Sequence, residues 1–258
     1  MYRIQYAIVL VLLYALSVCS FAQDKPATKS KTAAVKDVDP LALDVLKAVS
    51  QPIEQAQTFT FKALVSEEQL ATNGQIVTFF HTTEITVQRP DKVHLIFKGR
   101  GERVDFYGTS GSIIMYAPDT KLYSTMPAKA TIDDNLADIT AKGIDMPVGP
   151  FLSNHFYELV SKSLITGYVI GRVKIYDQDV HQLAFTSPDA DWQLWVTGGD
   201  SPRIVRAESI SKKLEGKPRT IVQFLEWNLS PTISADEFTF SKPPDAHQID
   251  MLMPKGGK

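Results

Sequence analysis

Cysteine is almost absent from this sequence, since its 258 residues include only Cys19. That cysteine lies in a segment with one basic residue, Arg3, an apolar run over residues 7–18 and a small residue at Ala22. The pattern is typical of a secretory signal peptide, so we predict a signal peptide over residues 1–22, cleaved after Ala22, and a periplasmic mature chain. A mature chain without cysteine forms no disulfide and must be stabilised by its core alone.

Long hydrophobic runs are also missing. The run over residues 7–18 has 12 residues, whereas a membrane-spanning helix needs about 20, so we expect no transmembrane segment in the mature chain. Residues 16–19 (LSVC) offer an alternative, because they resemble a lipoprotein box in which the cysteine is lipidated. That box has a small residue before the cysteine, and Val18 is not small, so we favour cleavage over lipid anchoring through Cys19.

Neither sign of charge is in excess, because 27 lysines and arginines stand against 29 aspartates and glutamates. A nucleic-acid-binding domain presents a basic face, and the near-neutral balance therefore argues against that class of partner. Apolar residues make up 44% of the chain, which is enough to build a globular core.

Motifs of catalytic and metal sites are missing as well. A hydrolase nucleophile needs an adjacent base, but the chain has no G-x-S-x-G motif, and Cys19 leaves with the signal peptide. Asp189, Asp191 and Asp200 lack the spacing and the glycine of a calcium-binding loop. We therefore predict no enzyme activity, no catalytic residue, no cofactor and no metal, with a hydrolase as the weakest alternative. The histidines are scattered and form no H-E-x-x-H zinc motif: His81, His94, His155, His181 and His247.

What the sequence does have is a long series of strand patterns. Residues 180–196 alternate apolar and polar on both sides of an acidic turn, which predicts a hairpin with Trp192 and Trp195 on opposite faces of one strand. Asn-Gly at residues 73–74 predicts another hairpin. Similar alternation elsewhere gives about eleven strands, mostly joined by tight turns, and hence a mainly β, antiparallel sheet that must curl or close as it twists.

Three helices are expected beside the sheet. Asp39 followed by proline predicts a helix start, and Pro52 bends or ends that helix. Thr131 and Asp134 predict the start of a second helix that stops at Gly143. The third helix is the short second helix of the insert, expected over residues 154–162. We predict one domain over residues 39–249, preceded by a flexible linker over residues 23–38 and followed by a loose tail over residues 250–258.

Several short motifs carry a resemblance to a known family. The motifs are QRPDKV (88–93), YAP (116–118), LY (122–123), HQLAF (181–185), DWQLW (191–195) and WNLSP (227–231). In this order along the chain they resemble a family of predicted periplasmic proteins that is catalogued as a domain of unknown function, and the resemblance covers residues 39–249.

That family is in turn similar to the superfamily of outer-membrane lipoprotein carriers. The resemblance implies an unclosed antiparallel barrel around a hydrophobic cavity, with helices on the concave side acting as a lid. Some of these proteins bind the acyl chains of lipoproteins, and others sense envelope stress. In the carriers an arginine ties the lid to the barrel, and no position of this sequence matches it.

Two functions follow as expectations. The first is a monomeric, non-enzymatic periplasmic carrier or binding protein for a lipid, an acyl chain or a lipidated peptide. The alternative is an envelope sensor that binds a protein partner through the sheet edge or the helical insert and has a filled interior. Periodicity does not separate a hollow barrel from a filled one, so the apolar strand residues either line a cavity or fill a core: Phe59, Phe61, Leu95, Phe97, Phe106, Met115, Trp192, Leu194 and Trp195.

Overall fold

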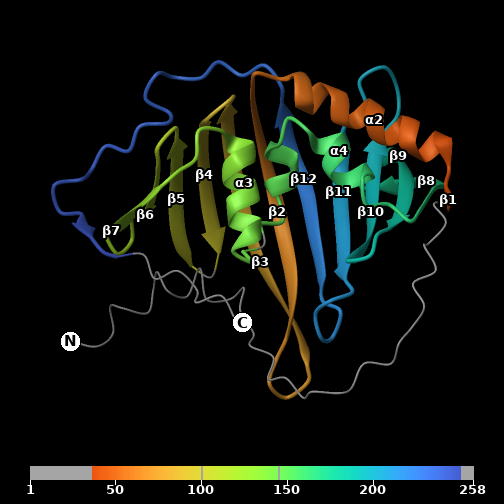
Figure 1. Cartoon of the computed structure of the whole chain (residues 1–258), viewed down its shortest axis with the longest axis horizontal. Coiled ribbons are helices and arrows are strands. Elements are labelled where there is room, and N and C mark those ends of the chain that lie inside the picture. Colours follow the sequence, from red (N-terminus) through yellow and green to blue (C-terminus); the bar gives the residue numbers. More distant parts are fainter. Residues whose placement is uncertain (1–36, 100, 145, 251–258) are drawn as a thin grey trace.

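The computed structural model describes residues 37–99, 101–144 and 146–250 (Figure 1). The predicted signal peptide, Cys19, most of the linker and nearly all of the tail lie outside the described residues. The elements, in chain order, are β1 (Asp37–Val38), α2 (Pro40–Gln55), β2 (Thr58–Leu70), β3 (Ile76–Gln88), β4 (Lys92–Gly99), β5 (Glu102–Thr109), β6 (Ser112–Ala117), β7 (Leu122–Pro127), α3 (Ile132–Ala141), the 3-10 turn η1 (Gly149–Leu152), α4 (Phe156–Ser161), β8 (Thr166–Ile175), β9 (Gln178–Thr186), β10 (Ala190–Thr197), β11 (Ile204–Ser211), β12 (Arg219–Asn228) and β13 (His247–Gln248).

The described strands form one unclosed, curved sheet of 13 strands, in the order β1-β8-β9-β10-β11-β12-β2-β3-β4-β5-β6-β7-β13. All neighbours pair antiparallel except at the two edges, where β1 pairs with β8 and β13 with β7 in parallel. The prediction of a mainly β, curved antiparallel sheet is confirmed. The two strands beyond the predicted eleven are these two-residue edge strands, which are too short to leave a periodic pattern in the sequence.

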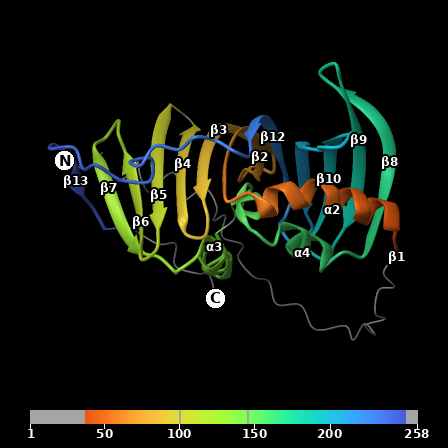
Figure 2. The same cartoon turned by 90° about the horizontal axis from the view of Figure 1, so that it is seen from above.

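The helices gather on one face of the sheet, its concave side (Figures 1 and 2). α2 runs across β8–β12, and the insert between β7 and β8 supplies α3, η1 and α4 to the same face. This insert carries the chain from one edge of the sheet to the other, so that β2 and β12, far apart in the sequence, lie side by side at the centre.

Local capping chemistry sets the helix starts. The Asp39 side chain accepts a hydrogen bond from the backbone N–H of Leu41 at 2.9 Å, as expected of an N-cap residue. The Thr131 hydroxyl accepts from the Asp134 backbone N–H at 3.1 Å and donates to the Asp134 carboxylate at 2.7 Å. Both predicted starts are confirmed, whereas Pro52 does not end its helix, which continues to Gln55.

The predicted hairpin of β9 and β10 is confirmed, with Trp192 opposite Phe185 and Trp195 opposite Gln182. The Trp192 and Phe185 rings stack at 4.2 Å on the helix-covered face. Trp195 lies on the opposite face, where the Arg206 guanidinium sits 5.4 Å from its ring centre.

The segment after β12 crosses the outer face of β4–β7, away from the helices. Phe240 packs there among the rings of Tyr107, Tyr116 and Tyr123, at centroid distances of 5.7, 5.2 and 5.4 Å. The part of the outer face around these three tyrosines is therefore covered by the chain's own C-terminal segment.

Candidate functional site

Apolar side chains line up across the concave face of β2–β7. Register places them in rows that run at right angles to the strands, because residues paired in neighbouring strands point to the same face. One row contains four of the predicted cavity residues and ends on a serine: Phe61, Ile85, Leu95, Phe106, Met115 and Ser124.

A second row lies beside the first and includes Phe97. It runs from Ala63 on β2 through Thr83 and Phe97 to Val104 on β5. Ala63, Thr83 and Val104 are buried, and Phe97 is half-buried. The two rows form an apolar strip that extends from the centre of the sheet toward the β7 edge.

The structure divides the predicted residues into three groups. Eight of them share the concave face, but only some lie on the strip beyond the helices. Trp195 is separate, because it points to the outer face. The main core cluster contains Phe59, Phe61, Leu95 and Leu194, with Phe97, Phe106 and Trp192 packed against it, and Met115 belongs to a second, small cluster.

The half of the concave face beneath α2, η1 and α4 is filled. Phe61 meets Phe224 at 5.5 Å and Trp227 at 4.8 Å between ring centres. Phe224 in turn contacts Phe151 of η1 at 4.9 Å in an edge-to-face arrangement, a geometry that aromatic pairs favour. Phe59 is fully buried within this cluster. These residues act as core.

The half over β4–β7 is different. In Figure 1, none of the described helices lies in front of β5, β6 or β7, and α3 stands beside this region. Val104, Met115 and Ala117 form a second, small apolar cluster there, and Phe106 packs against both this cluster and the main core. The strip therefore continues beyond the helix-filled half, but most of it is buried: Val104, Met115 and Ala117 are 3%, 4% and 7% exposed.

Two hydroxyl groups interrupt this apolar strip. Thr83 is 2% exposed and Ser124 is 1% exposed. Neither Thr83 Oγ1 nor Ser124 Oγ has a hydrogen-bond partner within the described part of the chain. Native proteins seldom bury a polar group without a partner, because it costs free energy.

Arg89, in the turn between β3 and β4, joins the sheet to two of the helical segments. Its guanidinium donates hydrogen bonds to the carbonyl oxygens of Ala56 (2.7 Å), Leu152 (3.0 Å) and Ser153 (2.9 Å). These carbonyls follow α2 and end η1, and helix C-termini leave such groups free to accept. The guanidinium also lies 4.9 Å from the ring centre of Phe59.

Further hydrogen bonds tie the helices together around Arg89. The backbone N–H of Ile132, at the start of α3, donates to the carbonyl of Pro90 at 2.9 Å. The Glu54 carboxylate of α2 accepts from the backbone N–H of Tyr157 in α4 at 2.6 Å. Burial lowers the pKa of Arg89, and the carboxylates of Asp133 and Glu54 oppose that shift. We call this set of contacts the Arg89 junction.

Sequence reasoning did not identify Arg89. It belongs to the QRPDKV motif on which the family resemblance partly rests, but nothing local distinguishes it from an ordinary turn arginine. Its three acceptors lie 33, 63 and 64 residues away along the chain. Only the folded structure brings them together.

His81 borders the strip and gives a pH-dependent prediction. It stacks on Phe97 at 4.4 Å, and burial lowers its pKa from 6.5 to about 4. The Glu67 carboxylate lies 3.5 Å from His81 Nδ1. The unfolded chain takes up a proton as the pH falls below about 6.5, while the folded chain does so only near 4, so stability is lost over this interval.

We therefore expect the free energy of unfolding to fall by about 2 kcal/mol between pH 7 and roughly pH 4.5 through His81 alone. The His81→Phe variant keeps the stacking on Phe97 and should lose this part of the pH dependence. Denaturant titrations at the two pH values measure it, with the exposed His155→Gln as the matched control. An unchanged pH slope in His81→Phe would contradict the assignment.

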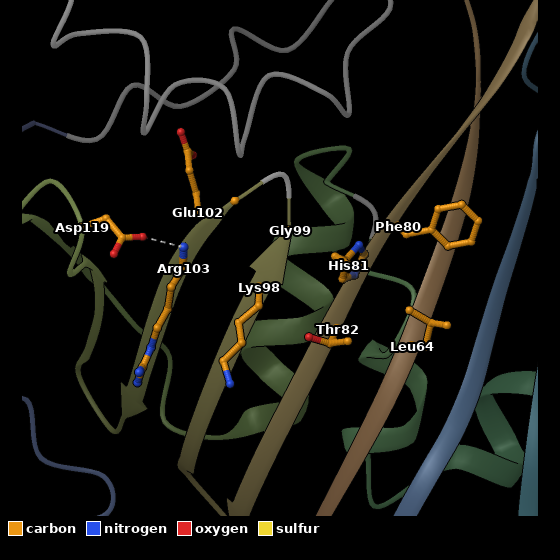
Figure 3. Close-up of a pocket in the computed structure, with 10 residues that line it drawn as sticks. Leu64, Phe80, His81, Thr82, Lys98, Gly99, Glu102, Arg103 and Asp119 are labelled. Carbon is orange, nitrogen blue, oxygen red and sulfur yellow. Dashed lines mark hydrogen bonds between the residues drawn. The ribbon is translucent and has the colours of Figure 1, made fainter.

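A shallow depression lies on the outer face, over β2–β5 (Figure 3), with a volume of about 390 Å³. Leu64 and Phe80 form its apolar end, and Phe80 is 60% exposed. Lys98 and Arg103 form its charged end, but each is already paired with a carboxylate, at 2.8 Å for Lys98 and 2.7 Å for Arg103. The depression therefore offers exposed apolar surface and no free cation for an anionic ligand.

Two other features are absent from the described part of the chain. Among residues 37–99, 101–144 and 146–250, no three histidine, cysteine, aspartate or glutamate side chains come together as a metal-binding group. No helix in that part of the chain has both the length and the apolar character needed to cross a membrane.

Comparison with known proteins gives a family match. The model of a family described as "Predicted periplasmic protein (DUF2092)" matches residues 42–252. No curated protein matches the chain.

Solved structures with a similar fold have low sequence identity. Lipoprotein LppX of Mycobacterium tuberculosis is 13% identical, with 76% of this chain and 100% of that chain covered and a TM-score of 0.49. LprF of Mycobacterium bovis is 14% identical, with 76% and 97% covered and a TM-score of 0.48. An uncharacterized conserved protein of Thermus thermophilus is 11% identical, with 82% and 99% covered and a TM-score of 0.44.

Proposed function

Because the chain belongs to the DUF2092 family of predicted periplasmic proteins, we propose that it is a non-enzymatic periplasmic protein that binds a lipid or acyl chain on the concave face of β4–β7. The observation that carries this proposal is the apolar strip, which continues past the helix-filled core onto strands that no described helix covers in Figure 1. Phe97 and Phe106 are half-buried in this strip, and Met115 is buried. An acyl chain gains about 0.8 kcal/mol for each CH₂ group that it buries. No reacting group is needed for such binding.

The Arg89 junction fixes the helices at the border of this site. It holds the ends of α2 and η1 to the sheet through one side chain, and the start of α3 is fixed to the same turn by Ile132. A ligand would reach the buried part of the strip only if a neighbouring segment moved, because Leu95 and Met115 are at most 8% exposed. Arg89 thus joins helices to the sheet, although no arginine of the sequence could be assigned to that position beforehand.

Filling the strip tests the proposal directly. The Met115→Trp variant adds bulk in the row that contains Phe106, and we expect it to weaken the binding of a fluorescent fatty acid about tenfold or more. Ile114→Trp is the matched control, because Ile114 is the neighbouring residue on the same strand and points to the outer face. If Met115→Trp unfolds, Met115→Phe makes a smaller change of volume. Equal binding by the wild type and a folded strip-filling variant would overturn the proposed site.

Native mass spectrometry of the exported protein, followed by organic extraction, tests the ligand class. A lipid that co-purifies at fixed stoichiometry is the expected result. A clean mass of the unliganded chain, together with no uptake of the fluorescent fatty acid, would overturn the proposal of a lipid-binding protein.

A second candidate function is the binding of an envelope protein. The exposed apolar side chains of Leu64 and Phe80 on the outer depression favour it, since exposed apolar patches often mark protein interfaces. Chemical cross-linking in cells tests this candidate. If the wild type cross-links to an envelope protein and Phe80→Ser does not, while both take up the fatty acid equally, the result supports protein binding. Loss of uptake without loss of the cross-link would support lipid binding instead.

A further inference from the structure

One asparagine lies in a sequence that matches the acceptor motif of N-glycosylation. The motif is Asn-x-Ser or Asn-x-Thr with any residue except proline in the middle, and residues 228–230 (NLS) fit it. The other three asparagines of the chain have neither serine nor threonine two residues later: Asn73, Asn135 and Asn154. Asn228 is therefore the single candidate acceptor of this sequence.

The structure presents this motif at the surface. Asn228 is the last residue of β12, at the end from which the C-terminal segment leaves the sheet (Figure 1), and it is exposed. Glu226 and Asn228 point to the outer face, because Trp227 between them points inward to the core. An enzyme that approaches the outer face therefore meets both side chains next to each other on one strand.

The chain turns at Asn228. Its side-chain oxygen Oδ1 accepts a hydrogen bond from the Ser230 backbone N–H at 3.0 Å, which closes a turn of the kind that short polar side chains form with their own backbone. This hydrogen bond leaves out Asn228 Nδ2, the atom to which a sugar is joined. It also uses the backbone of Ser230 and not its hydroxyl, so the turn does not explain why a hydroxyl stands at this position.

Glu226 places a carboxylate beside the acceptor. It is exposed, and the lysine opposite it on β2, Lys62, contacts Glu84 of β3 at 3.6 Å. An acidic residue two positions before the asparagine is the feature that extends the general motif to the form used by bacterial transferases of the periplasm. A carboxylate on the same face as Asn228 offers such an enzyme a charge-assisted contact.

We propose that Asn228 is an acceptor for N-glycosylation in the periplasm, with a polyprenyl-diphosphate-linked oligosaccharide as the donor. Asn228 Nδ2 forms a bond to the anomeric carbon of the first sugar, and the bond from that carbon to the diphosphate oxygen breaks. The polyprenyl diphosphate leaves with the bonding electrons, and the transferase takes up one proton from Nδ2. The inference does not depend on the proposed lipid site, which is on the concave face.

Intact-mass measurement tests the inference. The folded, purified protein is incubated with a bacterial oligosaccharyltransferase and a lipid-linked oligosaccharide of known mass. The wild type should gain the mass of one oligosaccharide, whereas Asn228→Gln and Ser230→Ala should gain none. Ser230→Thr keeps the hydroxyl and is the matched control, which should be modified. Ser230→Ala keeps the backbone N–H that closes the turn, so we expect its thermal midpoint to stay at the wild-type value.

Glu226→Gln should slow the modification about tenfold, because it removes the charge and keeps the shape of the side chain. An equal rate would contradict the part assigned to Glu226. The inference would be overturned by a wild type that stays unmodified in a reaction that modifies a reference acceptor peptide. Equal modification of Ser230→Ala, or modification of the heat-unfolded chain alone, would also overturn it, because the folded motif would then not be what the enzyme recognises.

Discussion

The Arg89→Ala substitution is expected to lower the free energy of unfolding by about 3 kcal/mol or more, which corresponds to a fall of roughly 6–12 °C in the thermal midpoint. Three carbonyl groups, those of Ala56, Leu152 and Ser153, lose a charged donor at once. Hydrogen bonds to charged groups contribute more than neutral ones, and partly buried acceptors without a donor are costly.

The effect on dynamics should be local. Backbone amides of α3 and the residues around η1 are expected to exchange with solvent faster in Arg89→Ala, while the amides at the centre of the sheet keep their protection. Arg89→Lys should restore only part of the stability, because one ammonium cannot reproduce the fork of a guanidinium. Arg172→Ala, at an exposed arginine of β8, is the control. A midpoint within about 1 °C of the wild type, with unchanged exchange in α3, would show that Arg89 does not hold the helices.

The second large effect is expected at Phe59. This ring is fully buried beneath the helices, stacked with Phe61 at 6.4 Å and tilted against Trp227 at the same distance. Phe59→Ala should lower the free energy of unfolding by about 3–5 kcal/mol, the range for a large aromatic removed from a packed core. Denaturant titration measures this value.

Phe106→Ala is the informative comparison, because Phe106 is half-buried on the other half of the same face. We expect it to cost less stability than Phe59→Ala and to weaken lipid binding more. The reverse order, with Phe59→Ala well tolerated, would mean that the helix-covered half is hollow and that the ligand lies beneath α2.

Much of the fold followed from local patterns. Asp39 and Thr131 start helices because their side chains satisfy backbone N–H groups within the same turn. The alternation around Trp192 and Trp195 places them on opposite faces because successive side chains of a strand alternate. These effects act over a few residues, so the sequence displays them directly.

The candidate site was only partly predictable. The alternation of apolar and polar residues predicted that Phe97, Phe106 and Met115 face the inside of the sheet. It is the same for strands beneath the helices and for strands beyond them. The distinction depends on where α2, η1 and α4 lie, and that depends on the crossover from β7 to β8. The two-residue strands β1 and β13 were missed because their pairing is with distant edges and not with a chain neighbour.

The sequence by itself thus determined the mainly β architecture, the helix starts and the face on which most apolar side chains lie, because these depend on contacts between near neighbours in the chain. Only the tertiary structure decided which half of the concave face is filled, that Trp195 is excluded from it, that Arg89 joins sheet and helices, and that Thr83 and Ser124 share an apolar strip. Each of these depends on groups brought together from distant parts of the chain, and no local pattern records which distant groups will meet.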